Sequence, residues 1–111
     1  MVPENITAIL ARNETWSGDA ASEPYEAGWA REAVLFVRAL KTPVGAMPNA
    51  RVEMSPDGMH WLPEGTTLEM PTVKDGVAAA RISRFGNWLR LAAHFESGAE
   101  ATVLVTLHLK A

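Results

Sequence analysis

Three histidines and a scatter of carboxylates are the residue types in this chain that acid–base or metal chemistry would use. His60, His94 and His108 lie far apart in the sequence and show no metal-ligand spacing. The sequence contains no Gly-x-Ser-x-Gly nucleophile elbow, glycine-rich phosphate loop or His-Glu-x-x-His segment. We therefore expect a protein that is not an enzyme, with no catalytic residues, no metal and no cofactor.

Two metal hypotheses stay open beside that expectation. His94 and His108 fall on the last two predicted strands, where they can approach each other across a sheet face, although several residue pairs apart. Asp19, Glu23 and Glu26 form an acidic loop whose oxygens would suit calcium, but their spacing matches no established calcium loop. We interpret the histidines as polar residues on a partly solvated sheet face, and the carboxylates as a solvated loop.

Aromatic residues indicate binding rather than catalysis. The chain has four tryptophans, and an exposed tryptophan can stack on a sugar ring or anchor a protein interface. We expect Trp16, in a polar loop, and Trp88, on an outer strand face, to be exposed, and Trp29 and Trp61 to lie in the core. The candidate binding residues come from this loop and this strand face: Trp16, Tyr25, Trp88, Arg90, His94 and His108.

A strand–turn–strand signal at Val52 to Trp61 indicates the fold class. Apolar residues alternate with Glu53 before the turn Ser-Pro-Asp-Gly. Pro56 sets φ to about −65° at the first turn position, and Gly58 can take the positive φ that closes the turn. The pattern predicts an antiparallel hairpin, and therefore a β domain.

Proline punctuates the chain between the apolar runs, which is where a sheet protein keeps it. The runs predict seven or eight short strands, with turn signals about every 8–12 residues. We expect an all-β, antiparallel two-sheet β-sandwich, jelly-roll-like or immunoglobulin-like, forming one domain over residues 1–111. The predicted strands are 6–12, 31–41, 50–55, 60–62, 66–70, 76–83, 88–95 and 101–110.

Two of these strands carry more specific predictions. The run from Ala33 to Val37 is apolar at successive positions, which is typical of a central strand covered on both faces. The last two strands are expected to pair as a hairpin through the loop 97–99. In that register one face is wholly apolar and forms part of the core, and the other carries Trp88, Arg90, His94 and His108.

Composition restricts the partners. The formal net charge is −3 and Lys and Arg are scattered, so we expect no nucleic-acid partner. No apolar run approaches the roughly 20 residues of a membrane span, and the first residues lack the pattern of a secretory signal. The chain has no cysteine and so does not depend on an oxidising compartment. We expect a soluble protein with no membrane contact, made in the cytoplasm without a signal peptide.

The Val-x-x-Ser-x-Asp-Gly-x-x-Trp run at Val52 to Trp61 resembles the strand–turn–strand of discoidin-like (coagulation factor 5/8 C-type) galactose-binding domains. This resemblance is local, and no sugar-binding residue carries over from it.

A second resemblance covers more of the chain. A Ser-x-Pro-aromatic element at Ser22 to Tyr25 precedes a long apolar strand, the Ser-Pro-Asp-Gly hairpin and a Gly-x-x-x-Arg-Leu strand at Gly86 to Leu91. This order is similar to small β-sandwich proteins of tailed phages and prophages, which are regarded as virion structural or head-decoration components. The resemblance implies a subunit that binds other protein subunits, as a homo-oligomer or in a capsid-like assembly, and is incorporated into a virion. The alternative is a carbohydrate-binding module that stacks Trp16 and Tyr25 on glycans.

Overall fold

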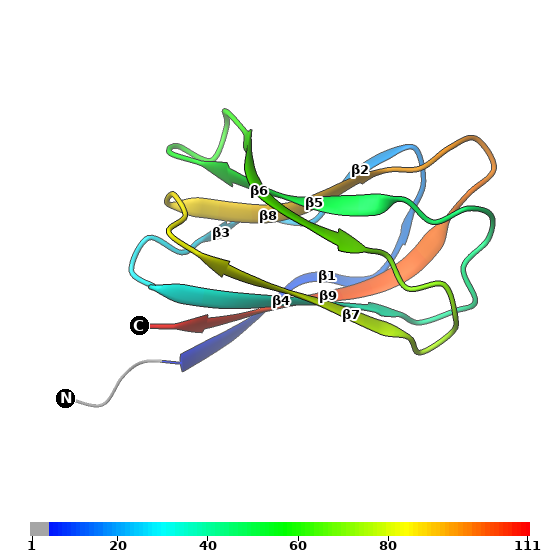
Figure 1. Cartoon of the computed structure of the whole chain (residues 1–111), viewed down its shortest axis with the longest axis horizontal. Helices are drawn as coiled ribbons and strands as arrows, with labels where there is room; N and C mark the ends of the chain where they lie inside the picture. Colours follow the sequence, from blue (N-terminus) through cyan, green and yellow to red (C-terminus); the bar gives the residue numbers. More distant parts are fainter. Residues whose placement is uncertain (1–4) are drawn as a thin grey trace.

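The computed structural model describes residues 5–111, which form nine β-strands and no helix (Figure 1). Every strand pair is antiparallel and the strands form two sheets, so the predicted fold class is confirmed. None of these residues lies in a helix long and apolar enough to cross a membrane. The strands are β1 (Asn5–Trp16), β2 (Asp19–Ala21), β3 (Tyr25–Glu26), β4 (Glu32–Ala39), β5 (Asn49–Ser55), β6 (Leu62–Glu69), β7 (Val77–Ser83), β8 (Trp88–His94) and β9 (Ala101–Lys110).

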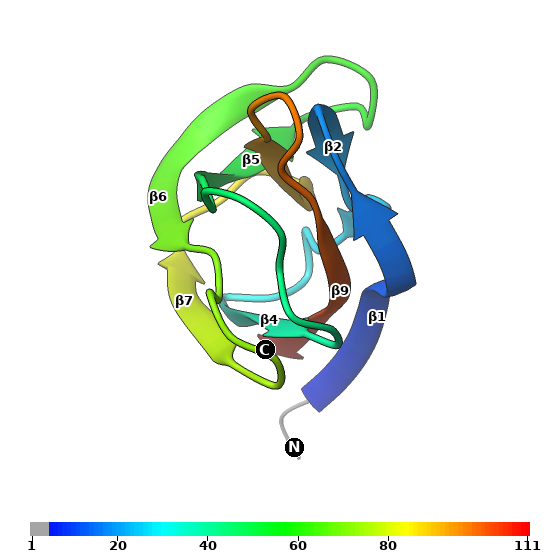
Figure 2. The ribbon, with the colours of Figure 1, turned by 90° about the vertical axis from the view of Figure 1, so that its right-hand side faces the viewer.

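The strands divide between a four-stranded sheet, in the order β1-β9-β4-β7, and a five-stranded sheet. The order in the second sheet is β2-β8-β5-β6, and the short strand β3 also pairs with β8. Viewed along the long axis, the two sheets enclose a common interior, with β6 beside β7 at one margin (Figure 2). Nine strands form where eight were listed, because β2 and β3 form between the predicted strands 6–12 and 31–41, and the predicted strands 60–62 and 66–70 merge into one.

The core is built by the period-two alternation of side chains along the strands. Burial of each large apolar side chain contributes about 1.5–3 kcal/mol. The alternate apolar residues of β8 and β9 that were predicted to face the core are all buried, so that prediction is confirmed. The large apolar side chains with the least exposure are Leu35, Val37, Val52, Leu89, Leu91, Phe95, Val103, Val105, Leu107 and Leu109.

The predicted pairing of the last two strands is wrong. β8 pairs with β5 in the five-stranded sheet, and β9 pairs with β1 and β4 in the other. After β8, the backbone N–H of Phe95 donates to the carbonyl of Gly18 at 2.8 Å, and the chain then crosses between the sheets through residues 96–100. Two strands that face one core from opposite sheets show the same alternation as two paired strands. The apolar pattern therefore could not distinguish the two arrangements.

The predicted coverage of the apolar strand is also corrected. β4 lies between β9 and β7, as a central strand should. Its inward residues Ala33, Leu35 and Val37 are buried, but Val34 and Phe36 point outward and are only half-buried. The strand is thus covered on one face, although its sequence is apolar on both.

The predicted hairpin after Val52 is confirmed, since β5 and β6 pair with Met54 opposite Leu62. Its second strand is longer than expected, because the predicted strands 60–62 and 66–70 merge into β6. Gly65 has a φ of 114° within β6, and the β5–β6 register shifts between Arg51 and Glu53. The extra residues of this shift lie in β6, while the β5–β8 register is regular, so Arg51, Glu53 and Ser55 reach the outer surface by ordinary alternation.

Candidate functional site

Three of the four residues predicted for the outer face of the last two strands lie on the outer surface of the five-stranded sheet. Along β8, Trp88, Arg90 and His94 lie on this surface together with the buried Ala92, and Leu89, Leu91 and Ala93 face the core. The β5 residues opposite Arg90 and Trp88 are Glu53 and Ser55. We call this surface the charged face and define it by Asp19, Arg51, Glu53, Ser55, Trp88, Arg90 and His94.

Glu53 is the centre of the charged face. Its residue exposure is 7 %, and its carboxylate accepts hydrogen bonds from two guanidinium groups. Arg90 Nε donates to Oε1 at 2.7 Å, and Arg51 Nε donates to Oε2 at 3.1 Å. The paired charges offset the cost of removing the carboxylate from water.

Trp61 covers this ion cluster instead of entering the core. The Arg90 Cζ atom lies 4.3 Å from the centroid of the Trp61 ring, which is a cation–π contact. Trp61 is half-buried, so its predicted position in the core is wrong. The structure leaves Arg90 with a carboxylate on one side and an indole ring on another, which restricts its access to an outside ligand.

The turn after β5 is closed by two side chains. The Ser55 hydroxyl accepts from the backbone N–H groups of Asp57 at 3.2 Å and Gly58 at 2.9 Å, and donates to Asp57 Oδ1 at 2.9 Å. Oδ1 also accepts from the backbone N–H groups of Met59 and His60, both at 2.9 Å. Asp57 therefore has a structural role in the turn.

These hydrogen bonds favour the ionised form of Asp57. The backbone N–H of His60 is the largest cause, followed by the His60 side chain, whose Nδ1 lies 2.6 Å from Asp57 Oδ2. They hold the pKa of the Asp57 carboxyl well below its ordinary value of 3.8.

The same turn lies against Trp88. A Cβ atom added at Gly58 would lie 3.3 Å from Cδ2 and Cε2 of the Trp88 indole, so the backbone of the turn contacts the ring directly. Trp88 is half-buried as a result. At the other end of β8, His94 Nδ1 lies 2.6 Å from Asp19 Oδ1, and both of these side chains are exposed.

The opposite outer surface, on the four-stranded sheet, carries an apolar patch between polar ends. One row across the sheet runs from Ile9 through Thr106 and Phe36 to Ala79, and the neighbouring row runs from Leu104 through Arg38 to Val77. No described strand lies over these residues (Figure 1). We call this surface the aliphatic face and define it by Ile9, Val34, Phe36, Val77, Ala79, Leu104 and Thr106.

Several of its side chains are well exposed. Ile9 is 44 % exposed and Val77 is 60 % exposed, while Val34, Phe36 and Leu104 are half-buried. Neighbouring side chains of the same sheet supply this partial burial. An apolar patch that is flanked by polar groups is typical of a protein-interaction surface.

His108 belongs to this second surface. Its ring meets Phe36 edge-on, with centroids 5.1 Å apart, and its Nδ1 lies 3.1 Å from the Thr7 hydroxyl. His94 and His108 therefore lie on the outer surfaces of different sheets, and the expectation that they share one face is wrong. The cause is the placement of β8 and β9 in separate sheets.

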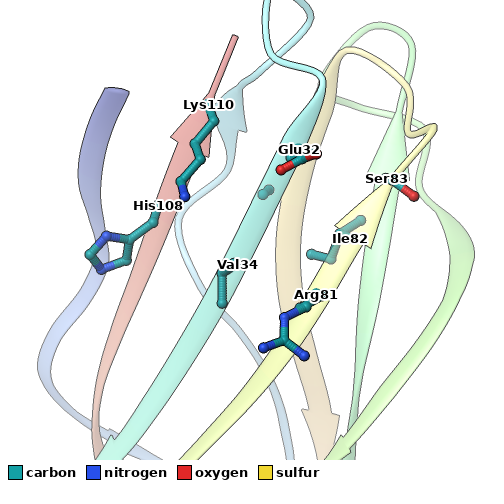
Figure 3. A pocket seen from close by; sticks show the side chains of 8 residues that line it. Glu32, Val34, Arg81, Ile82, Ser83, His108 and Lys110 are labelled. Atoms are coloured by element: carbon teal, nitrogen blue, oxygen red, sulfur yellow. The ribbon is translucent and has the colours of Figure 1, made fainter. Parts of the chain in front are cut away.

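Charged groups border the aliphatic face at both ends of the sheet. Arg38, with Asp75 at 2.9 Å, lies at the end of Leu104 and Val77, and a second charged group lies at the opposite end. A groove of about 350 Å³ lies there, with Val34 between His108 and Arg81, and with Glu32 and Lys110 farther along (Figure 3). An aliphatic floor with a charged margin matches the anatomy of protein interfaces, which have an apolar centre and a polar rim.

The remaining candidates lie elsewhere. Trp16 ends β1 with 3 % exposure, and its Nε1 donates to Glu14 Oε1 at 3.2 Å, so the prediction that it is exposed in a loop is wrong. Tyr25 is half-buried against the core, as is Trp29. The acidic residues Asp19 and Glu26 have separate partners, since Glu26 accepts from the backbone N–H of Gly28 at 2.9 Å. Within residues 5–111 no three His, Asp or Glu side chains cluster as metal ligands would.

Sequence reasoning missed Glu53 and Trp61 as partners of Arg90, and it missed the aliphatic face. Glu53 and Arg90 are separated by 37 positions, and only the β5–β8 register brings them together. The aliphatic face did leave a signal in the sequence, because the apolar run in β4 supplied side chains for two covered faces.

Comparison with known proteins shows a likeness of fold. No protein-family model and no curated protein sequence matches the chain. The solved structure of the SPBc2 prophage-derived protein YomS matches 100 % of this chain and 96 % of its own, with 8 % identity and a TM-score of 0.62. A chain of the Bacillus endospore appendages, described as disulfide-linked pili, matches 97 % of this chain and 86 % of its own, with 12 % identity and a TM-score of 0.42. The chain therefore shares its β-sandwich fold with YomS.

Proposed function

We propose that this chain is a non-enzymatic structural subunit that assembles with other protein subunits through its aliphatic face. The setting we propose is a phage-like particle, in which the chain is a head-decoration component or a similar part.

The observation that carries this proposal is the half-covered strand β4. Its sequence supplies apolar side chains to both faces, but the fold buries one face and leaves Val34 and Phe36 at the surface beside exposed Ile9 and Val77. Removing such side chains from water is favourable by about 25 cal/mol per Å² of apolar area. A protein partner that packs on this sheet would bury the outward apolar side chains of β4, which the subunit alone leaves at the surface.

The charged face is a weaker candidate for the assembly contact. Glu53 already pairs with Arg90 and Arg51, and Trp61 lies over Arg90. A partner would gain little from groups whose charges are neutralised within the subunit. The binding roles of Trp88, Arg90 and His94 stay predictions, and we assign the main contact to the other sheet.

The phage setting rests on the order of sequence elements described above, which is similar to that of phage and prophage β-sandwich proteins. The prophage origin of YomS agrees with this setting, and at 8 % identity its contribution to the argument is the common fold. The carbohydrate-binding alternative loses its main support, because the Trp16 ring is buried and Tyr25 packs against the core.

The proposal is tested by changing the aliphatic face without touching the core. Val77→Glu with Leu104→Glu places two carboxylates on this face. Met59→Glu with Leu62→Glu is the matched control, since Met59 and Leu62 are exposed apolar residues in the turn and on β6. We expect the face variant to lose self-association in sedimentation velocity and the control to retain it. Equal association of the face variant and the wild type would contradict the proposal.

A further inference from the structure

The first half of β1 has an unpaired backbone edge. β1 is the terminal strand of its sheet, and residues 5–9 pair on one side only, with residues 106–110 of β9. Farther along, the carbonyl of Leu10 accepts from the backbone N–H of Glu23 at 2.9 Å, so a loop covers the edge from there. Within the described chain, no backbone hydrogen bond outside β9 reaches residues 5–9.

This open edge lacks the features that prevent an edge strand from pairing with a strand of another molecule. The sequence Asn-Ile-Thr-Ala-Ile contains no charge, no proline and no glycine, and three of its five residues are β-branched. Ile6 is 37 % exposed and Ile9 is 44 % exposed. The register shifts of β1 begin only after Ile9. Natural edge strands are usually protected by charges, prolines or bulges, because unprotected edges pair with other strands.

The other margins of the molecule are protected. β7 carries Arg81 and lies beside β6, and β6 itself carries Glu64, Pro63 and Gly65. β2 spans only three residues and begins with Asp19. The unprotected edge is therefore local to residues 5–9, and a partner strand can add there by main-chain hydrogen bonding.

We infer that this edge pairs antiparallel with the same edge of a second copy of the chain, as the first step of the assembly proposed above, on which this inference rests. In the register centred on Thr7, Thr7 faces its own copy, Asn5 faces Ile9, and Ile6 faces Ala8. No like charges are opposed, and opposite threonines form a favourable cross-strand pair. The symmetry is a two-fold axis, which is the commonest arrangement of homo-oligomers.

The pairing also extends the proposed contact surface. Thr7 and Ile9 lie on the outer side of the four-stranded sheet, opposite His108 and Thr106. A two-fold axis normal to the sheet keeps the outer sides of both copies on the same side. The two four-stranded sheets then form one eight-stranded sheet, in which the two aliphatic faces lie on the same side and are offset along the strands, because Ile9 of each copy faces Asn5 of the other. The second copy is favoured over an unrelated strand because it places a second aliphatic face on the same side of a single sheet.

A charge-exchange experiment tests the inference. Thr7→Lys and Thr7→Glu each place like charges at the two-fold axis, while an equimolar mixture of the two variants places opposite charges there. Thr15→Lys is the matched control, because Thr15, like Thr7, is an exposed β1 threonine hydrogen-bonded to a β9 side chain, but it lies beyond the open edge at residues 5–9. We expect each Thr7 variant to have half the molar mass of the wild type by light scattering. The mixture should recover the wild-type mass, and the control should keep it.

An unchanged mass for both Thr7 variants, or a mixture with no recovery, would overturn the inference. Circular dichroism of each variant verifies that the sheets are folded. The Val77→Glu and Leu104→Glu variant separates the two proposals. If it loses higher association while the Thr7 variants keep the wild-type mass, edge pairing fails and the proposed function stands. If the Thr7 variants halve in mass while the face variant associates as the wild type does, the edge contact stands and the role of the aliphatic face fails.

Discussion

Glu53 is the residue on which the charged face depends. Its carboxylate is nearly buried, with 10 % side-chain exposure, and two arginines of different exposure donate to it. The Arg90 side chain is 27 % exposed and the Arg51 side chain is 44 % exposed. Because a less hydrated partner compensates a buried charge more effectively, the two arginines should contribute unequally to stability.

The first prediction compares these two arginines. Arg90→Met should lower the free energy of unfolding by about 2 kcal/mol, because it leaves a nearly buried carboxylate with one partner. Arg51→Met should cost less than about 1 kcal/mol, since its side chain is more hydrated. Urea denaturation of both variants measures the difference. Equal losses would contradict the assignment of Arg90 as the principal partner of Glu53.

The second prediction concerns pH and Asp57. Since the folded state lowers the pKa of this carboxyl below 3.8, its contribution to stability is present above that pH and is lost as the pH falls through the folded-state value. Asp57→Asn should therefore be less stable than the wild type near neutral pH, and the gap should shrink between about pH 4 and about pH 2.

Urea midpoints measured across that pH range give the comparison. Glu69→Gln serves as its control, because Glu69 is an exposed carboxyl on β6. A gap between Asp57→Asn and the wild type that stays constant down to about pH 2 would show that the carboxylate is not stabilised in the folded protein.

At the scale of single elements, the β5–β6 hairpin depends on its glycine. Gly58 has a φ of 81°, and a Cβ there would lie 3.3 Å from the Trp88 indole, so a side chain meets both backbone strain and a steric contact. Gly18 has a φ of 56°, but nothing lies within 4 Å of a Cβ built on it. Substitutions at these two glycines therefore distinguish the effect of backbone strain, present at both, from the effect of contact with the ring, present only at Gly58.

The third prediction follows from this comparison. Gly18→Ala should lower the free energy of unfolding by about 1 kcal/mol through the positive φ alone. Gly58→Ala should cost more, because the Trp88 ring must also move. The tryptophan fluorescence maximum should shift in Gly58→Ala and stay unchanged in Gly18→Ala. Equal free energies of unfolding for the two variants, with unchanged fluorescence spectra, would show that the turn does not pack against the Trp88 ring.

The elements also show how far the sequence predicts this molecule. Strand positions and inward faces were predictable, because apolar side chains in half-buried strands recur with period two. The partner of each strand was not, since β8 and β9 show the same alternation whether they pair or face each other. The contact of Glu53 with Arg90 depends on that pairing, so it was equally inaccessible. Trp61 was misplaced because an indole covering a guanidinium has the same sequence signal as one in the core.

At the scale of the whole molecule, the two outer surfaces differ in what they leave unsatisfied. The charged face pairs its charges within the subunit, while the aliphatic face leaves apolar side chains such as Ile9 and Val77 exposed. Beside this face lies the unprotected edge of β1 at residues 5–9. The two sheets therefore differ in their capacity for protein contacts. We expect both the face contact and the edge contact of the assembly to be made by the four-stranded sheet.

The most direct test of this account is the molar mass of the wild-type protein in solution, measured by light scattering behind a sizing column over a range of concentrations. We predict a defined mass that is an even multiple of the 12.0 kDa chain. This mass should fall when the aliphatic face carries Val77→Glu and Leu104→Glu. A mass of 12.0 kDa at every concentration, unchanged by these substitutions, would contradict it.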